Sequence, residues 1–190
     1  TPPASVTPPA PRAATPVQAA RADSVRHSFT AADVEFVTGM IHHHAQALIM
    51  AGMAPTHGAS PALRILAERI INGQRDEIAL MQTWLRDHGQ SVPEPGHIHA
   101  MHMPGMLTPE QMAELYSAHG PEWDRLFLTY MIQHHRGALT MVDDLFSIDG
   151  AGQGDRIFKL ASDIGADQAS EIDRMQSMLY DMVFVTGNLR

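Results

Sequence analysis

Histidine and methionine are the residues of this chain whose types and spacing point most clearly to chemistry. The 190 residues include 12 His and 13 Met but no Cys. Thioether and imidazole groups are the ligands that select Cu(I), and imidazole also suits Cu(II). Without thiols the chain can form neither disulfides nor Cys-ligated zinc or iron–sulfur sites. The composition therefore favours binding of a soft metal ion.

The densest group of such ligands is the stretch GHIHAMHMPGM at residues 96–106. Its Pro and Gly residues predict an extended loop, in which alternate side chains point to one side and can close around an ion. The alternative is a Met-rich lid that packs over one end of a bundle. We predict a copper site here, with six candidate ligands: His97, His99, Met101, His102, Met103 and Met106.

A second group of candidate ligands recurs along the chain, because one helical hairpin occurs twice. Residues of the stretch GMIHHHAQALIMAGM at 39–53 reappear 91 positions later. The residues of a second helix, which include Glu77, reappear at a slightly longer offset, with Glu171 in its place. His42 becomes Gln133, so its role is not duplicated. The repeated candidates are Met40, His43, His44 and Met50, then Met131, His134, His135 and Met141.

Each repeated set falls on one face of a helix by the i, i+3, i+4, i+7 rule. Two interpretations remain open for these faces. They could present metal ligands to the interior, or they could be ordinary core in which each buried His is satisfied by a hydrogen bond. Glu77 and Glu171 could accept such bonds.

The elements that must position these groups are all helical. Capping residues and helical periodicity predict helices over residues 31–53, 61–89, 109–117, 121–147 and 155–182. The hairpins 30–89 and 121–182 then form a four-helix bundle over residues 29–182, joined by the loop and short helix 90–120. We expect residues 183–190 to form a C-terminal tail, with residues 183–185 as the one candidate strand.

We expect residues 1–28 to form a Pro/Ala-rich extended tail or assembly arm. Six of the 13 prolines lie in the first 16 residues, and such a segment cannot build a core of its own. It could be a disordered linker, or residues 1–22 could dock on the body or on a neighbouring subunit. Docking on a neighbour would give a homo-oligomer or head-to-tail polymer, so a structural subunit of an extracellular fibre is the alternative function.

In both halves, the motif M-I-x-H-H followed by A-L-x-M resembles a known family. So does the doubled E-I-x-x-M-Q at residues 77–82 and 171–176. The chain is similar, over about residues 30–182, to the ferritin-like domain-of-unknown-function family that includes secreted, CopM-like copper-binding proteins. The resemblance implies an all-α, ferritin-like bundle, export to the periplasm or the extracellular space, and copper or silver binding by the Met and His of the motif.

Several other functions are disfavoured. The formal charge of −8 argues against a nucleic-acid partner, and no apolar run is long enough to span a bilayer. A di-metal oxidase, the third candidate, needs Glu-x-x-His on two helices, but Glu77 is followed by Leu80 and Glu171 by Arg174. Residue 1 is Thr, so we expect that a leader has been removed. We therefore expect an exported, non-catalytic metal-binding protein.

Overall fold

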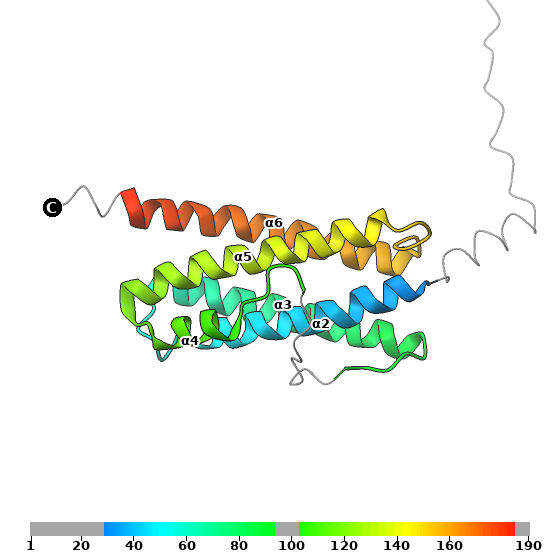
Figure 1. The fold of residues 1–190 in the computed structure, drawn as a ribbon, viewed down its shortest axis with the longest axis horizontal. Helices are drawn as coiled ribbons and strands as arrows, with labels where there is room; N and C mark the ends of the chain where they lie inside the picture. The colour runs from blue at the N-terminus through cyan, green and yellow to red at the C-terminus, as the bar shows by residue number, and fades with distance from the viewer. Residues whose placement is uncertain (1–28, 94–102, 185–190) are drawn as a thin grey trace, which may run out of the picture.

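The computed structural model describes residues 29–93 and 103–184, and these residues form five helices without a strand. The helices are α2 (Ala31–Gly52), α3 (Pro61–Asp87), α4 (Pro109–Ser117), α5 (Gly120–Ser147) and α6 (Asp155–Phe184), as shown in Figure 1. The predicted all-α class is confirmed for the described residues. The suggestion of a strand at 183–185 is wrong at its first two positions, because α6 continues through Phe184.

The helix starts are fixed by local capping. The side chain of Thr30 accepts the backbone N–H of Asp33 at 3.2 Å, and Asp33 accepts the backbone N–H of Thr30 at 2.7 Å. Thr108 and Gln111 form the same reciprocal capping box at the start of α4. Ser60 caps α3, with Pro61 at its first position. Such caps satisfy amide groups that a helix start leaves free.

Two antiparallel hairpins, α2–α3 and α5–α6, lie side by side to make the bundle (Figure 1). Within each hairpin the helices pack closely, and the hairpins meet mainly through α2 and α5. The helices α3 and α6 make fewer contacts with each other on the opposite side. The bundle is therefore tighter between α2 and α5 than between α3 and α6.

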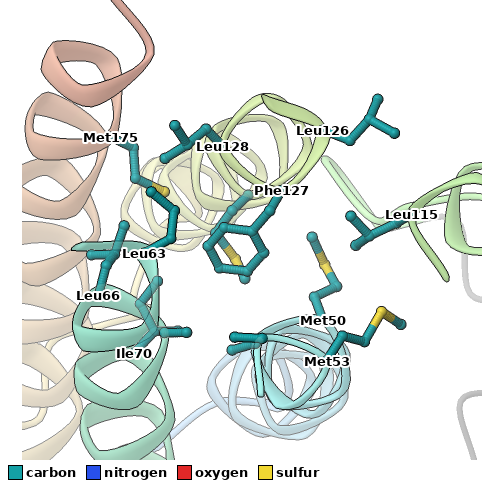
Figure 2. Close-up of a cluster of buried hydrophobic side chains, with 14 of the residues drawn as sticks. Met50, Met53, Leu63, Leu66, Ile70, Leu115, Leu126, Phe127, Leu128 and Met175 are labelled. Carbon is teal, nitrogen blue, oxygen red and sulfur yellow. The ribbon is translucent and has the colours of Figure 1, made fainter. Parts of the chain in front are cut away.

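Buried apolar side chains fill the bundle in two clusters. Figure 2 shows one of them, in which Phe127 lies among Met50, Leu66 and Met175 from three other helices. The second cluster gathers around Met40 and includes residues of α2, α3, α5 and α6. Fully burying one such side chain stabilises a fold by about 1.5–3 kcal/mol, so these clusters supply most of the driving force.

The two hairpins are also joined through a repeated pair of buried aspartates, Asp33 and Asp124. Asp33 accepts the backbone N–H of Gly152, in the turn of the other hairpin, at 2.7 Å. Its counterpart Asp124 accepts the backbone N–H of Ser60, before α3, at 3.2 Å. Each carboxylate thus satisfies a backbone donor of the opposite hairpin, which fixes how the two hairpins dock.

Several sequence predictions fall outside the described residues. These are the docking of residues 1–22, the form of the tail 1–28, and most of the Met/His loop before Met103. They stay predictions. Among the described helices, none is both long and apolar enough to cross a membrane.

Candidate metal-binding site

The repeated histidines lie in the interior of the bundle. His43 and His44 on α2, and His134 and His135 on α5, have no exposed surface. Helical spacing puts each pair on the inward face of its helix, as the repeat predicted. The four side chains therefore lie in the interior, on the two helices through which the hairpins mainly meet.

One histidine of each pair is bonded to a glutamate within its own hairpin. The Nε2–H of His44 donates to Oε2 of Glu77 at 2.7 Å, and that of His135 donates to Oε2 of Glu171 at the same distance. These are the bonds that a structural role for the pairs requires. They fix α2 to α3 and α5 to α6 by equivalent contacts.

The other histidine of each pair lies at the contact between the hairpins. The rings of His43 and His134 pack against each other with centroids 3.8 Å apart and a tilt of 37°. The Nε2–H of His134 donates to the backbone oxygen of His43 at 2.9 Å, whereas that of His43 donates to the backbone oxygen of Pro104 at 3.0 Å. The repeat symmetry is broken here by the inter-hairpin loop.

Burial keeps both of these imidazoles neutral. Loss of hydration, followed by the neighbouring His44, lowers the pKa of His43 to about 3. The same loss of hydration, followed by the neighbouring His43, lowers the pKa of His134 well below its ordinary value. A buried imidazolium would be costly, and neutral imidazole is also the form that can bind a metal ion.

Residues 103–107, which we call the anchor segment, attach the end of the Met/His loop to the bundle. Gln46 on α2 donates to the backbone oxygen of Leu107 at 3.1 Å and accepts the backbone N–H of Leu107 at 2.8 Å. Gln133 on α5 donates to the backbone oxygen of Gly105 at 3.4 Å. Together with His43, these side chains hold the segment over α2 and α5.

Two glycines let the anchor segment lie directly on α5. A Cβ at Gly137 would lie 2.0 Å from the backbone oxygen of Pro104, and one at Gly105 would lie 2.6 Å from the backbone oxygen of Gln133. Gly105 also has a φ of +75°, in the left-handed region that favours glycine. The backbones of the segment and the helix are therefore in direct contact.

The segment brings a predicted loop ligand next to a predicted bundle ligand. The sulfur of Met103 and the terminal methyl group of Met141 both lie over Gly39, at 3.5 Å and 3.4 Å from the position that a Cβ there would take. Both methionines are half-buried. Met106 is half-buried as well, in the same segment.

The remaining predicted ligands are more dispersed. Met50 and Met131 are fully buried in one apolar cluster and Met40 in the other. No three His, Asp or Glu side chains within residues 29–93 and 103–184 gather closely enough to hold a metal ion. Four predicted ligands lie outside the described residues: His97, His99, Met101 and His102.

Sequence reasoning missed the residues that hold the anchor segment, chiefly Gln46, Gln133 and Gly137. The signal was available, because the two copies of the repeat differ there. Gln46 stands where the second copy has Gly137, and His42 stands where it has Gln133. At both of these positions, a residue that contacts the anchor segment in one copy of the repeat has a different counterpart in the other.

The family follows from comparison with known proteins. The family model described as a domain of unknown function, DUF305, matches residues 33–179. This chain belongs to the DUF305 family. A DUF305 fragment from Deinococcus radiodurans has 31% sequence identity and a TM-score of 0.70, with 80% of this chain and 97% of that chain covered. A DUF305 protein of Streptomyces coelicolor that is predicted to be secreted has 27% identity and a TM-score of 0.70, with 80% and 93% covered.

The copper-binding protein CopM is also a structural relative of this DUF305 protein. Its Cu(II)-bound form has 30% identity and a TM-score of 0.65, with 78% of this chain and 96% of that chain covered. CopM has also been solved bound to Cu(I) and to silver. A bacterioferritin-related thioferritin from Bacteroides fragilis, at 12% identity and a TM-score of 0.64, shows that the fold is ferritin-like. A comparison with curated proteins found no match.

Proposed function

We propose that this DUF305 protein binds copper and silver ions outside the cytoplasm through its Met/His loop. The observation that carries the proposal is the meeting of Met103 and Met141 over Gly39. The anchor segment fixes one end of the ligand-rich loop against α2 and α5, where the bundle supplies a further thioether. A loop tethered in this way needs less ordering when it closes on an ion.

The proposed ligands suit a soft ion. Thioethers are neutral and polarisable, and with imidazoles they select Cu(I) over harder divalent ions. Ag(I) is a soft ion of the same charge. The protein's part is to bind and retain the ion, without a chemical step. The ligands proposed for this site are His97, His99, Met101, His102, Met103 and Met106 of the loop, with Met141 of the bundle.

The interior histidines form a second candidate location for an ion. The Nδ1 atoms of all four have no hydrogen-bond partner among the described residues. Their Nε2 atoms are engaged, so only Nδ1 is free to bind. The second candidate set is Met40, His43, His44, Met50, Met131, His134 and His135.

The relatives support both the proposed metal ions and the proposed location outside the cytoplasm. CopM, which has been solved with Cu(I), Cu(II) and silver, shares 30% identity with this chain. The Streptomyces coelicolor relative is predicted to be secreted. Export would place the protein where metal ions arrive from the environment, so a role in storage, tolerance or transfer of copper follows.

The test is a titration of the full chain with Ag(I), in which calorimetry measures the binding affinity. Replacing the loop ligands together, His by Gln and Met by Leu, should weaken the tightest binding at least tenfold. Met103→Leu alone should weaken it several-fold. Met112→Leu, on α4, is the control because it makes the same change outside the anchor segment. Unchanged affinity after the combined replacement would remove the loop as the site.

A further inference from the structure

A second polar site lies between α3 and α6, on the face of the bundle opposite the anchor segment. There a cavity of about 230 Å³ opens to the surface between the two helices. Equivalent residues of the repeat line it from both sides, with Arg69, Gly73 and Ser170 beside them. The paired residues are Gln74 and Glu77 on α3, and Gln168 and Glu171 on α6.

The two glutamines of the cavity are buried without satisfying their amide groups. Gln74 is 2% exposed and Gln168 is 1% exposed. Neither amide atom of Gln74, nor Oε1 of Gln168, has a hydrogen-bond partner within the part of the chain that the structure describes. Buried polar atoms in native proteins are nearly always satisfied, by protein, water or ligand. Both glutamines line the cavity, and each leaves its Oε1 unsatisfied, which points to an occupant that can donate to them.

The charges around the cavity indicate that the occupant is a cation. Glu77, Glu171 and Asp167 line it, against the single positive charge of Arg69. Each glutamate uses Oε2 to accept a histidine N–H from inside the bundle, so its Oε1 can make a second interaction. Burial, followed by the charges of Glu77 and Glu171, raises the pKa of Asp167, so Asp167 lies close enough to both glutamates to be repelled by their charges.

The spacing of these groups decides which cation fits. Among the described residues, no three carboxylates or imidazoles converge closely enough to hold a bare ion. A hydrated ion avoids this difficulty, because its waters can donate to acceptors that are farther apart. Mg²⁺ keeps its waters readily, and six waters need roughly 180 Å³ at ~30 Å³ each, which the cavity provides. None of the residues that line the cavity carries a thioether that could bind copper.

We propose that the cavity between α3 and α6 binds a hydrated divalent cation of the magnesium class, held by water-mediated hydrogen bonds. The acceptors are the carboxylates of Glu77, Glu171 and Asp167, with Oε1 of Gln74 and Gln168. This site is independent of the proposed copper site, since it lies on another face and offers oxygen rather than sulfur ligands.

The test uses Mn²⁺, a paramagnetic stand-in for Mg²⁺, with the full chain freed of metal. Loss of the electron paramagnetic resonance signal of free Mn²⁺ measures binding. We expect one saturable site from which Mg²⁺ and hexamminecobalt(III) both displace Mn²⁺, because the cobalt complex presents N–H groups in place of bound water. Asp167→Asn and Gln74→Leu should each weaken binding at least tenfold. Asp173→Asn, the same charge change at an exposed position of α6, should alter it less than twofold.

Three results would overturn the proposal. The first is the absence of saturable Mn²⁺ binding, which would leave only water in the cavity. The second is an equal loss of Mn²⁺ affinity in Asp167→Asn and Asp173→Asn, which would mean that the cation responds only to the negative charge of the surface. The third is failure of hexamminecobalt(III) to compete, which would mean direct coordination. Ag(I) titration of the same samples keeps this outcome separate from the proposed copper binding.

Discussion

At the scale of single residues, the two copies of the repeat agree in the interior and differ where the anchor segment lies. His44 and His135 make the same bond to a glutamate at the same distance of 2.7 Å. By contrast, Gln46 binds the anchor segment, whereas its counterpart Gly137 lies beneath it. The repeat thus preserves the bond that holds each hairpin together, and the positions that contact the anchor segment are among those where its copies differ.

Gly137→Ala tests this direct contact between backbones. In an open helix the change would stabilise by up to ~1 kcal/mol, because Ala has the higher helix propensity. At Gly137 the new Cβ would lie 2.0 Å from the backbone oxygen of Pro104, so the segment must shift. We expect a net loss of about 1–3 kcal/mol in the free energy of unfolding by urea. Gly165→Ala, where the nearest atom is 3.6 Å away, should stabilise instead. Equal changes in the free energy of unfolding for Gly137→Ala and Gly165→Ala would contradict the direct contact between the anchor segment and α5.

The buried imidazoles predict an acid-sensitive fold. The pKa of folded His43 is lowered from 6.5 to about 3, so between these values the unfolded chain binds a proton that the folded chain does not. Stability should therefore fall as the pH decreases below 6.5, by up to about tenfold in the unfolding equilibrium per pH unit for each such group. Above pH 6.5 the effect should vanish.

Urea unfolding of the metal-free protein between pH 7.5 and 5 measures this dependence. His43→Gln should flatten the slope by about one proton, because Gln cannot titrate. His119→Gln provides the control, since His119 is exposed. A slope that His43→Gln leaves unchanged would show that His43 takes up no fewer protons in the folded state than in the unfolded state.

How much of the site follows from sequence depends on whether the interactions are local. Helical spacing was sufficient to place His43, His44, His134 and His135 on inward faces, and it offered Glu77 and Glu171 as acceptors under one of the two interpretations left open. The packing of the His43 ring against the His134 ring could not be foreseen. The two residues are 91 positions apart in the sequence, and their contact depends on how the two hairpins dock. The polar cavity between α3 and α6 was missed for the same reason.

At the scale of elements, the anchor segment is held by side chains rather than by secondary structure. Gln46 makes two hydrogen bonds to the backbone of Leu107, and both groups are buried. Gln46→Leu would leave the N–H and the carbonyl of Leu107 unsatisfied. We expect a loss of about 2–6 kcal/mol in the free energy of unfolding, at ~1–3 kcal/mol for each of the two buried groups.

Hydrogen exchange of the Leu107 amide gives a local readout for the same variant. Exchange should accelerate at Leu107 in Gln46→Leu, while amides in the centre of α5 keep their protection. Gln153→Leu is the control because Gln153 is exposed in the turn before α6. Retained protection at Leu107 would mean that Gln46 does not hold the segment.

The helices themselves were predictable because their signals are local. The predicted starts at residues 31, 61, 109 and 155 agree with the structure, since capping residues and proline act within one turn. The predicted ends at residues 117 and 147 also agree, whereas those of α2, α3 and α6 differ by one or two residues, because helix ends fray and carry weaker signals. The start of α5 at Gly120, one residue early, lacks a side-chain cap.

At the scale of the whole molecule, the duplicated hairpin gives two faces with different ligand chemistry. The α2–α5 face carries the anchor segment with its thioethers, and the α3–α6 face carries a cavity lined by carboxylates and amides. Duplication predicts equivalent hairpins, but it cannot say which face the single inter-hairpin segment covers. That choice requires the close approach at Gly105 and Gly137, which no periodicity reveals.

The measurement that tests the account most directly is a titration with Ag(I) monitored by NMR of methionine methyl groups. Ag(I) is diamagnetic, so each shifted signal reports a thioether that binds or lies next to the ion. At the first equivalent, the methyl groups of Met101, Met103 and Met106 should shift, with Met141 beside them, while Met40 and Met131 stay unchanged. Shifts confined to Met40 and Met131, with the loop methionines unaffected, would contradict the loop site and place the ion in the interior.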